Sequence, residues 1–230
     1  MATITTTFTV SASADDGQVT KSTSSATIPT SGWGSPSTSG SNIIVGSQEN
    51  YDNWPNYAKH YLGFFRFQNI TISQSATISS AYFKPYKSSY ASVPLVIHGI
   101  AADDAAAPST GSDLAASNFT SASVNWTDST GSTQQTSSDI KTIIQEIVDR
   151  SGWSSGNALT LALVTQTISY VGQYVWNARS YDYSSSSEAA ELVVEYEGGG
   201  AGGGGSISGI ANKIGSTIGN PVAYKIPNKE

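Results

Sequence analysis

Short runs of alternating apolar and polar residues recur through the first 197 positions of this 230-residue chain. The clearest is Ile4 to Val10, in which Ile4, Phe8 and Val10 alternate with threonines. A period of two places the apolar side chains on one face of a strand. The other runs that predict strands are 42–46, 62–67, 76–83, 93–101, 121–126, 159–165, 174–181 and 191–196. Because Ser, Gly, Pro and Asp clusters separate these runs, we predict an all-β sandwich.

One segment has a helical period instead. Its apolar residues follow the spacing of one helix face: Ile140, Ile143, Ile144, Ile147 and Val148. Ser137 or Ser138 is the expected N-cap, Asp139 lies in the expected first turn and Arg150 in the last. The sequence therefore predicts one short amphipathic helix over about 138–150, closing one end of the sandwich.

The composition excludes several classes of site. Ser and Thr account for 62 of the 230 residues while charged residues make up 12%, so we expect a surface rich in hydroxyl groups. No cysteine is present, which excludes disulfides, a thiolate nucleophile and a cysteine-ligated metal. Two histidines, His60 and His98, argue against a multi-histidine metal centre, and we expect no cofactor and no metal. A net charge of −6 predicts no nucleic-acid partner.

Membrane insertion and export are not expected. No apolar stretch approaches the roughly 18 residues of a membrane span. Residues 1–10 lack the basic start and the apolar run of a secretory signal. The sequence therefore predicts no membrane partner.

A glycine run divides the chain. Residues 198–205 read GGGAGGGG, which is typical of a flexible tether. We expect a sandwich over 1–197, with 8 basic and 16 acidic side chains, and a mildly basic arm over 206–230. Six aliphatic residues recur in the arm: Ile207, Ile210, Ile214, Ile218, Val222 and Ile226. An arm of this length cannot form its own core, so these residues are predicted to dock on a partner.

Aromatic residues stand out in the region 31–56, the longest expected irregular stretch. They are Trp33, Tyr51, Trp54 and the adjacent Tyr57, with Asn and Asp side chains between them. Flat rings with amide and carboxylate neighbours can bind a glycan. Burial against another subunit and packing of the loop on the sandwich are the alternatives.

The remaining candidates favour ordinary structural roles. Asp15-Asp16 and Asp103-Asp104 are expected in solvated turns, with calcium binding as the alternative. Trp153 is expected to pack the helix on the sheet rather than stack on a sugar. His98 is expected in the core or on a sheet face. We therefore expect no catalytic residues and no enzyme.

The order of several segments resembles a known family. They are 62–67, 72–82, 97–106, 123–126, 139–159, 179–182 and 190–196. Together they are similar to a jelly-roll family of bacterial surface proteins and bacteriophage structural proteins, allied to the DNRLRE and family-96 carbohydrate-binding sandwiches. The signature that names the DNRLRE group is absent. The resemblance implies a jelly-roll scaffold, on which function varies.

The arm and the resemblance together predict a non-enzymatic virion protein assembled in the host cytoplasm. It would be a bacteriophage capsid decoration or cement protein, or a tail-associated component. Its expected partners are other virion proteins and copies of itself, with a trimer as the expected oligomer. The alternatives are a carbohydrate-binding module for adsorption to host glycans, and an exported cell-surface module.

Overall fold

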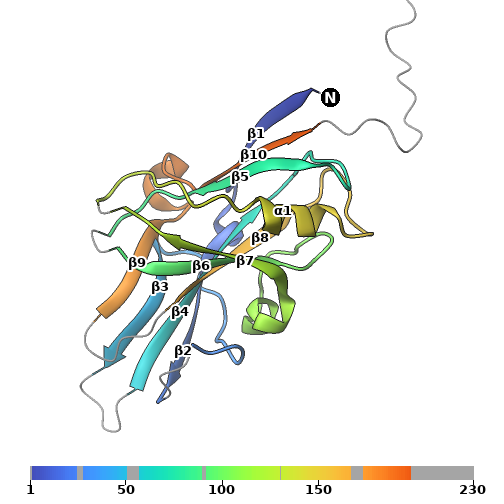
Figure 1. Ribbon diagram of the computed structural model, residues 1–230. Helices are drawn as coiled ribbons and strands as arrows, with labels where there is room; N and C mark the ends of the chain where they lie inside the picture. Colours follow the sequence, from blue (N-terminus) through green and yellow to red (C-terminus); the bar gives the residue numbers. More distant parts are fainter. Residues whose placement is uncertain are drawn as a thin grey trace, which may run out of the picture. The chain divides into compact units, whose positions relative to one another are not determined.

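The computed structural model describes residues 2–24, 28–50, 57–89, 92–129, 131–166 and 173–197. Over these residues the chain forms antiparallel sheets with one α-helix (Figure 1). The strands are β1 (Thr3–Thr9), β2 (Asp16–Thr23), β3 (Asn42–Asn50), β4 (Tyr57–Phe67), β5 (Ile78–Lys84), β6 (Pro94–Ile100), β7 (Phe119–Thr127), β8 (Leu159–Thr165), β9 (Gln173–Arg179) and β10 (Glu191–Glu197). The helices are α1 (Lys141–Val148) and the 3-10 turns η1 (Ser13–Asp15), η2 (Gly111–Leu114), η3 (Ala116–Asn118) and η4 (Tyr183–Ser186).

The strands follow the order of a jelly roll. One sheet has the order β1-β10-β5, and the segment 133–140 continues it because its amides bond to carbonyls of β5 and of Pro85. The second sheet contains β4-β8-β6-β7. With the segment 133–140 counted as a strand, these are the two four-stranded sheets of a double Greek key. Strands β2, β3 and β9 extend the second sheet beyond that plan, and the predicted β-sandwich is confirmed.

Strand β4 is buried on both faces. Phe65 and Phe67 belong to the main core between the sheets, whereas Leu62 and Phe64 belong to a second cluster on the opposite face. Its partner β8 divides in the same way, with Leu161 facing the main core. Strands covered on both faces have nearly continuous apolar sequences, which explains the run LGFFRF in β4.

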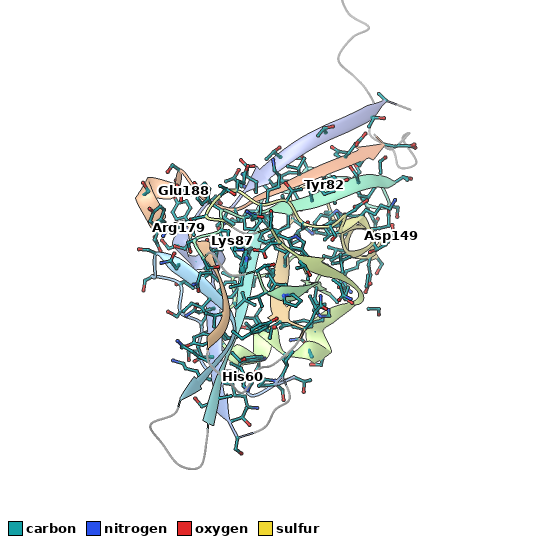
Figure 2. All side chains as sticks on the ribbon, turned by 60° about the vertical axis from the view of Figure 1, so that its left-hand side comes forward. His60, Tyr82, Lys87, Asp149, Arg179 and Glu188 are labelled. Atoms are coloured by element: carbon teal, nitrogen blue, oxygen red, sulfur yellow. The ribbon has the colours of Figure 1, made fainter. Side chains whose placement is uncertain are left out.

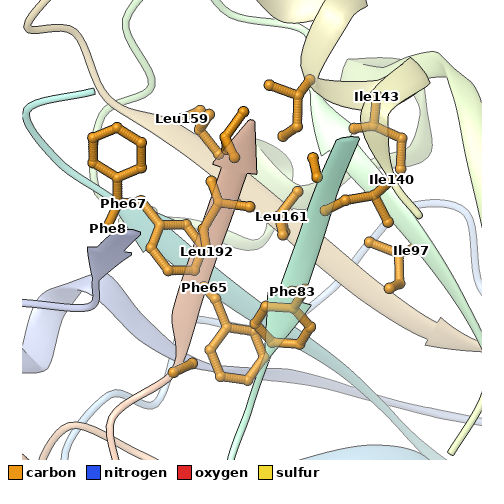
Figure 3. Close-up of a cluster of buried hydrophobic side chains, with 14 of the residues drawn as sticks. Phe8, Phe65, Phe67, Phe83, Ile97, Ile140, Ile143, Leu159, Leu161 and Leu192 are labelled. Carbon is orange, nitrogen blue, oxygen red and sulfur yellow. The ribbon is translucent and has the colours of Figure 1, made fainter. Parts of the chain in front are cut away.

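The main core joins both sheets to the helix (Figure 3). The ring of Phe83 from β5 lies 4.8 Å from the ring of Phe65, which brings the two sheets into contact. Helix α1 packs closely on β6 at Gly99, where an added Cβ would lie 2.8 Å from a methyl of Ile143 and 2.8 Å from a methyl of Ile147. The helix therefore depends on the absence of a side chain at that position.

The helix is shorter than the predicted 138–150. It spans Lys141–Val148, and its N-cap is Ile140 instead of Ser137 or Ser138. The hydroxyl of Ser137 is used elsewhere, since it accepts the Phe83 amide at 2.9 Å. Pairing with β5 therefore holds this segment extended and delays the start of the helix.

The strand predicted over 42–46 is confirmed but is longer, which shortens the irregular stretch predicted over 31–56. Strand β3 occupies Asn42–Asn50 and pairs with both β4 and β9. Strand β2, with the sequence DGQVTKST, was not predicted. Val19 is its one aliphatic residue, so no alternating apolar pattern marks it.

A buried ion pair lies beside the main core. Lys87 Nζ and Asp128 Oδ2 are 2.6 Å apart, and both side chains have an exposed fraction of 0%. Lys87 also donates to the Ser129 carbonyl at 2.8 Å, and Trp176 Nε1 donates to Asp128 Oδ2 at 2.7 Å. Figure 2 shows Lys87 among the side chains of the interior. The pair ties the loops after β5 and β7 to strand β9.

Removing one partner of this pair should be costly. Asp128→Ala leaves the Lys87 ammonium buried without its counter-ion, so we expect the free energy of unfolding to fall by about 3–5 kcal/mol. The matched control is Asp103→Ala in the Arg150–Asp103 pair, whose side chains are 35% and 44% exposed. There we expect a loss below about 1 kcal/mol. Urea unfolding measures both, and equal losses would contradict this account.

Candidate functional site

Trp33 packs inside the molecule rather than presenting its ring to a ligand. Its exposed fraction is 7%, and it lies in the second cluster with Val19, Leu62, Phe64, Leu114 and Ala162. Among the three alternatives, the described residues favour packing on the sandwich for this ring. Tyr51 and Trp54 lie outside the described residues, as do the arm residues Ile207, Ile210, Ile214, Ile218, Val222 and Ile226. Tyr57 begins β4, and its side chain is not among those described.

Asp15 and Asp16 do not lie in a solvated turn, so that prediction is wrong. Their exposed fractions are 1% and 0%. Asp15 pairs with Arg66 Nη1 at 2.6 Å and accepts a bond from Gln68 at 2.6 Å. Asp16 accepts the amide of Tyr181 through Oδ2 at 2.7 Å, while its Oδ1 is buried without a hydrogen bond. Asp15 ends η1 and Asp16 begins β2, a strand that the sequence pattern did not reveal.

The second acidic pair anchors a loop. Asp103 pairs with Arg150 Nε at 2.6 Å and its side chain is 44% exposed, as expected of a solvated turn. Asp104 accepts the amide of Ala158 at 2.8 Å. The two carboxylates therefore fix the loop after β6 to the helix end and to β8. Among the described residues, no group of three or more His, Cys, Asp or Glu side chains could hold a metal ion.

Two further predictions concern Trp153 and His98. Trp153 is 2% exposed and donates its Nε1 proton to the Ile72 carbonyl at 3.0 Å, which confirms the packing role. His98 lies on the outer face of β6, half-buried, and stacks on Phe119 with 4.7 Å between ring centroids. Burial lowers the pKa of His98 below its usual 6.5. Both residues therefore serve the packing of the sandwich.

In the second sheet, the edges at β2 and β9 are covered by other segments. Residues 34–37 run along β2, where the amides of Gln18 and Ser37 each donate to the other's carbonyl. Residues 86–89 run along β9, where Ser88 donates to the Asn177 carbonyl at 2.8 Å. Both cover part of an edge that would otherwise offer backbone groups to another chain.

The edges at β5 and β7 are covered as well. The segment 133–140 pairs with β5. At β7 the Glu146 carboxylate accepts the amides of Ser121 and Ala122, each at 2.8 Å. The Glu146 carboxylate of helix α1 thus accepts two β7 amides at an edge where no further strand pairs.

The edge of β1 has no such cover among the described residues. The amide of Val10, which follows β1, donates to the Ala190 carbonyl at 3.0 Å. Because inward and outward backbone groups alternate along an antiparallel strand, the even-numbered residues of β1 direct their N–H and C=O groups toward β10. The N–H and C=O groups of Thr3, Thr5, Thr7 and Thr9 therefore point away from the sheet. The strand has no charge, proline or register shift, which are the usual protections of an edge. Thr3 pairs with Glu197, so the open edge lies beside the end of β10 (Figure 1).

A pocket of about 420 Å³ lies where β6 separates from β8. The two strands pair as far as Gly99 and Leu161, while β8 continues along β4 to Leu159. Alanine side chains of the loop 101–107 and Pro108 form its apolar walls. Its polar lining comes from Ser109, Asp113, Ser117, Asn118 and Thr160.

The polar groups of the pocket differ in how they are held. Asp113 Oδ2 accepts the amides of Ser109 and Thr110 at 2.9 and 2.8 Å. These bonds lower the pKa of Asp113 below its usual 3.8, so it is ionised at neutral pH. Thr160 is 1% exposed, and its hydroxyl has no hydrogen-bond partner. The spacing of Thr110 and Asp113 is a capping-box signal that sequence reasoning could have used, and Thr160 is a lone hydroxyl early in the apolar run of β8.

Comparisons with known proteins found no matching family model and no matching curated protein. The resemblance to the jelly-roll family of surface and phage proteins therefore stays a prediction. No helix in the described ranges is long and apolar enough to cross a membrane.

Asp16 should make stability depend on pH. Burial raises its pKa from 3.8 to about 7, the Tyr181 amide bond opposes the rise, and the charges of Asp182 and Asp15 add to it. Between these two pH values the folded state keeps a proton that the unfolded chain has released. This residue therefore lowers the stability as pH rises from about 4 to 7.

Asp16→Asn removes this titration and leaves an oxygen to accept the Tyr181 amide. We expect the variant to gain stability relative to the parent as pH rises across that window, in thermal melts at fixed ionic strength. Parent and variant profiles that differ by a constant amount at every pH would contradict the assignment.

Proposed function

We propose that this chain is a non-enzymatic structural protein of a virion, either a bacteriophage capsid decoration protein or a tail-associated component. It assembles through the edge of β1 and through its C-terminal arm. The observation that carries the proposal is the open edge of β1 beside Glu197. The resemblance of the sequence to phage structural proteins supports the choice of assembly.

Strand addition suits the chemistry of β1. Thr3, Thr5, Thr7 and Thr9 offer alternate N–H and C=O groups, and a strand of a second chain can pair with all of them. Ile4 is 40% exposed and lies at the start of the strand, where added cover would bury apolar surface. Copies of this chain are the expected partners at this edge.

The arm supplies a second contact. Six aliphatic residues within 206–230 have too few neighbours in sequence to form a core, so a neighbouring protein covers them. In the sequence the glycine run follows directly on Glu197, the residue of β10 that pairs with Thr3 of β1.

A proline tests the edge. The N–H of Thr5 points away from β10, so Thr5→Pro removes an outward donor without removing a bond within the sheet. We expect this variant of the full chain to form smaller assemblies by light scattering and to keep its far-ultraviolet spectrum. The matched control is Thr5→Val, which keeps the donor and should assemble as the parent does. Equal assembly of the Pro variant would contradict a role for β1.

Removal of the arm tests the second contact. We expect the full chain to form oligomers and a chain ending at Glu197 to form fewer or none, because the arm aliphatics are lost. Sedimentation velocity of the two chains at matched concentration measures this. A full chain that stays a monomer at every concentration would contradict self-assembly.

A further inference from the structure

We propose that the side chains of Lys87 and Asp128 condense to an amide, which forms a covalent cross-link inside the folded chain. The reacting groups are already in contact, since Lys87 Nζ and Asp128 Oδ2 are 2.6 Å apart and both side chains have an exposed fraction of 0%. Figure 2 shows Lys87 in the interior. The inference does not rest on the assembly proposed above, because the pair involves neither β1 nor the arm.

The reaction balances with the two side chains alone. The lone pair of the Lys87 amine forms a bond to Cγ of Asp128, and the bond between Cγ and Oδ1 breaks. Two of the three protons of the ammonium leave with Oδ1 as water, and the third stays on the new amide nitrogen. One ammonium and one carboxylate thus give one amide and one water molecule, and the reaction needs no further reactant.

The contacts of the pair are those that the amide needs. Lys87 Nζ donates to the Ser129 carbonyl at 2.8 Å, and the amide N–H can keep this bond. Trp176 Nε1 donates at 2.7 Å to Asp128 Oδ2, the oxygen that becomes the amide carbonyl. Negative charge develops on this oxygen during the attack, and a fixed donor stabilises it. Trp176 is therefore a positioning residue for the reaction.

The second carboxylate oxygen of Asp128 gives an independent observation. Oδ1 is buried and has no hydrogen-bond partner among the described residues. A buried carboxylate oxygen without a partner is unfavourable, and a stable buried ion pair needs hydrogen bonds to its remaining lone pairs. Oδ1 is the atom that leaves as water. Condensation therefore removes the unsatisfied oxygen together with two buried charges.

The surroundings favour the neutral forms that react. Among the described residues, no further acid bonds to Lys87 Nζ or to the Asp128 carboxylate, so the proton of the ammonium passes directly to the carboxylate. An apolar interior opposes separated charges and favours this transfer. Aromatic rings supply that interior, since the ring of Trp126 lies 5.8 Å from that of Trp176 and 6.3 Å from that of Phe83.

The backbone holds both reacting residues in place. The amide of Lys87 donates to the Thr133 carbonyl at 2.9 Å, and the Lys87 carbonyl accepts the Ser132 hydroxyl at 3.0 Å. The Asp128 carbonyl accepts the Ser92 hydroxyl at 2.8 Å. Groups held in contact in this way react far faster than the same groups free in solution.

The cross-link would join the segment after β5 to the segment after β7. The chain has no cysteine, so no disulfide can do this. A covalent link between distant residues restricts the unfolded chain and so stabilises the fold. Where the amide has formed, Asp128→Ala loses the cross-link as well as the ion pair, and its loss of stability exceeds that expected for the ion pair alone.

Mass spectrometry of the full chain tests the proposal. We expect an intact mass lower than that of the sequence by one water molecule, and a branched peptide that joins Lys87 to Asp128 after proteolysis. Lys87→Arg keeps a cation beside Asp128 but has no nucleophilic amine, so it should lose no water. A parent chain of unreduced mass that yields no branched peptide would overturn the proposal, whether or not the variant folds.

A second variant separates the amide from another loss of water. Asp128 could instead cyclise onto the backbone nitrogen of Ser129, and that imide would persist in Lys87→Arg and give no branched peptide. Asp128→Asn should form the same cross-link with release of ammonia, because the side-chain nitrogen then leaves in place of Oδ1. Its branched peptide should have the same mass as that of the parent. Water loss that persists in Lys87→Arg without a branched peptide in the parent would contradict the cross-link.

Discussion

The architecture depends on the burial of β4 on both faces. This strand pairs with β2 along one side, and on the other side with β3 near its start and β8 near its end. Gly63 lies where these neighbours change, and an added Cβ there would lie 2.7 Å from a methyl of Val45. The strand thus joins the jelly-roll sheet to the β3 and β9 extension, and its two faces supply both hydrophobic clusters.

Both faces of β4 carry apolar side chains, and long connecting segments pack on the face that the other sheet does not cover. The segment 28–41 packs Trp33 on the face of β4 that points away from the main core, and η2 adds Leu114 to the same cluster. The same cover produces the pocket, since η2 and η3 close the gap left when β6 ends. Ordinary requirements of packing therefore place this pocket beside the central strands.

Alternating apolar residues made most strands predictable, and the all-β sandwich followed from them. The residues that sequence reasoning misplaced depend on contacts distant in sequence. Ser137 is a good N-cap in isolation, but the Phe83 amide takes its hydroxyl. Asp15 and Asp16 form a polar pair typical of a turn, yet Arg66 and Tyr181 make their burial possible. Trp33 lies in a polar segment, and its packing on β2 and β4 could not be read from its neighbours.

Pairing of the β1 edge with another chain would protect the outward amides of this strand from exchange. Hydrogen exchange followed by NMR distinguishes the two sets of amides in this strand. We expect the outward amides of Thr5, Thr7 and Thr9 to exchange quickly in dilute monomer and to become protected at concentrations where the protein assembles. The inward amides of Thr6 and Phe8 should be protected under both conditions. Outward amides that stay unprotected in the assembled protein would contradict this pairing.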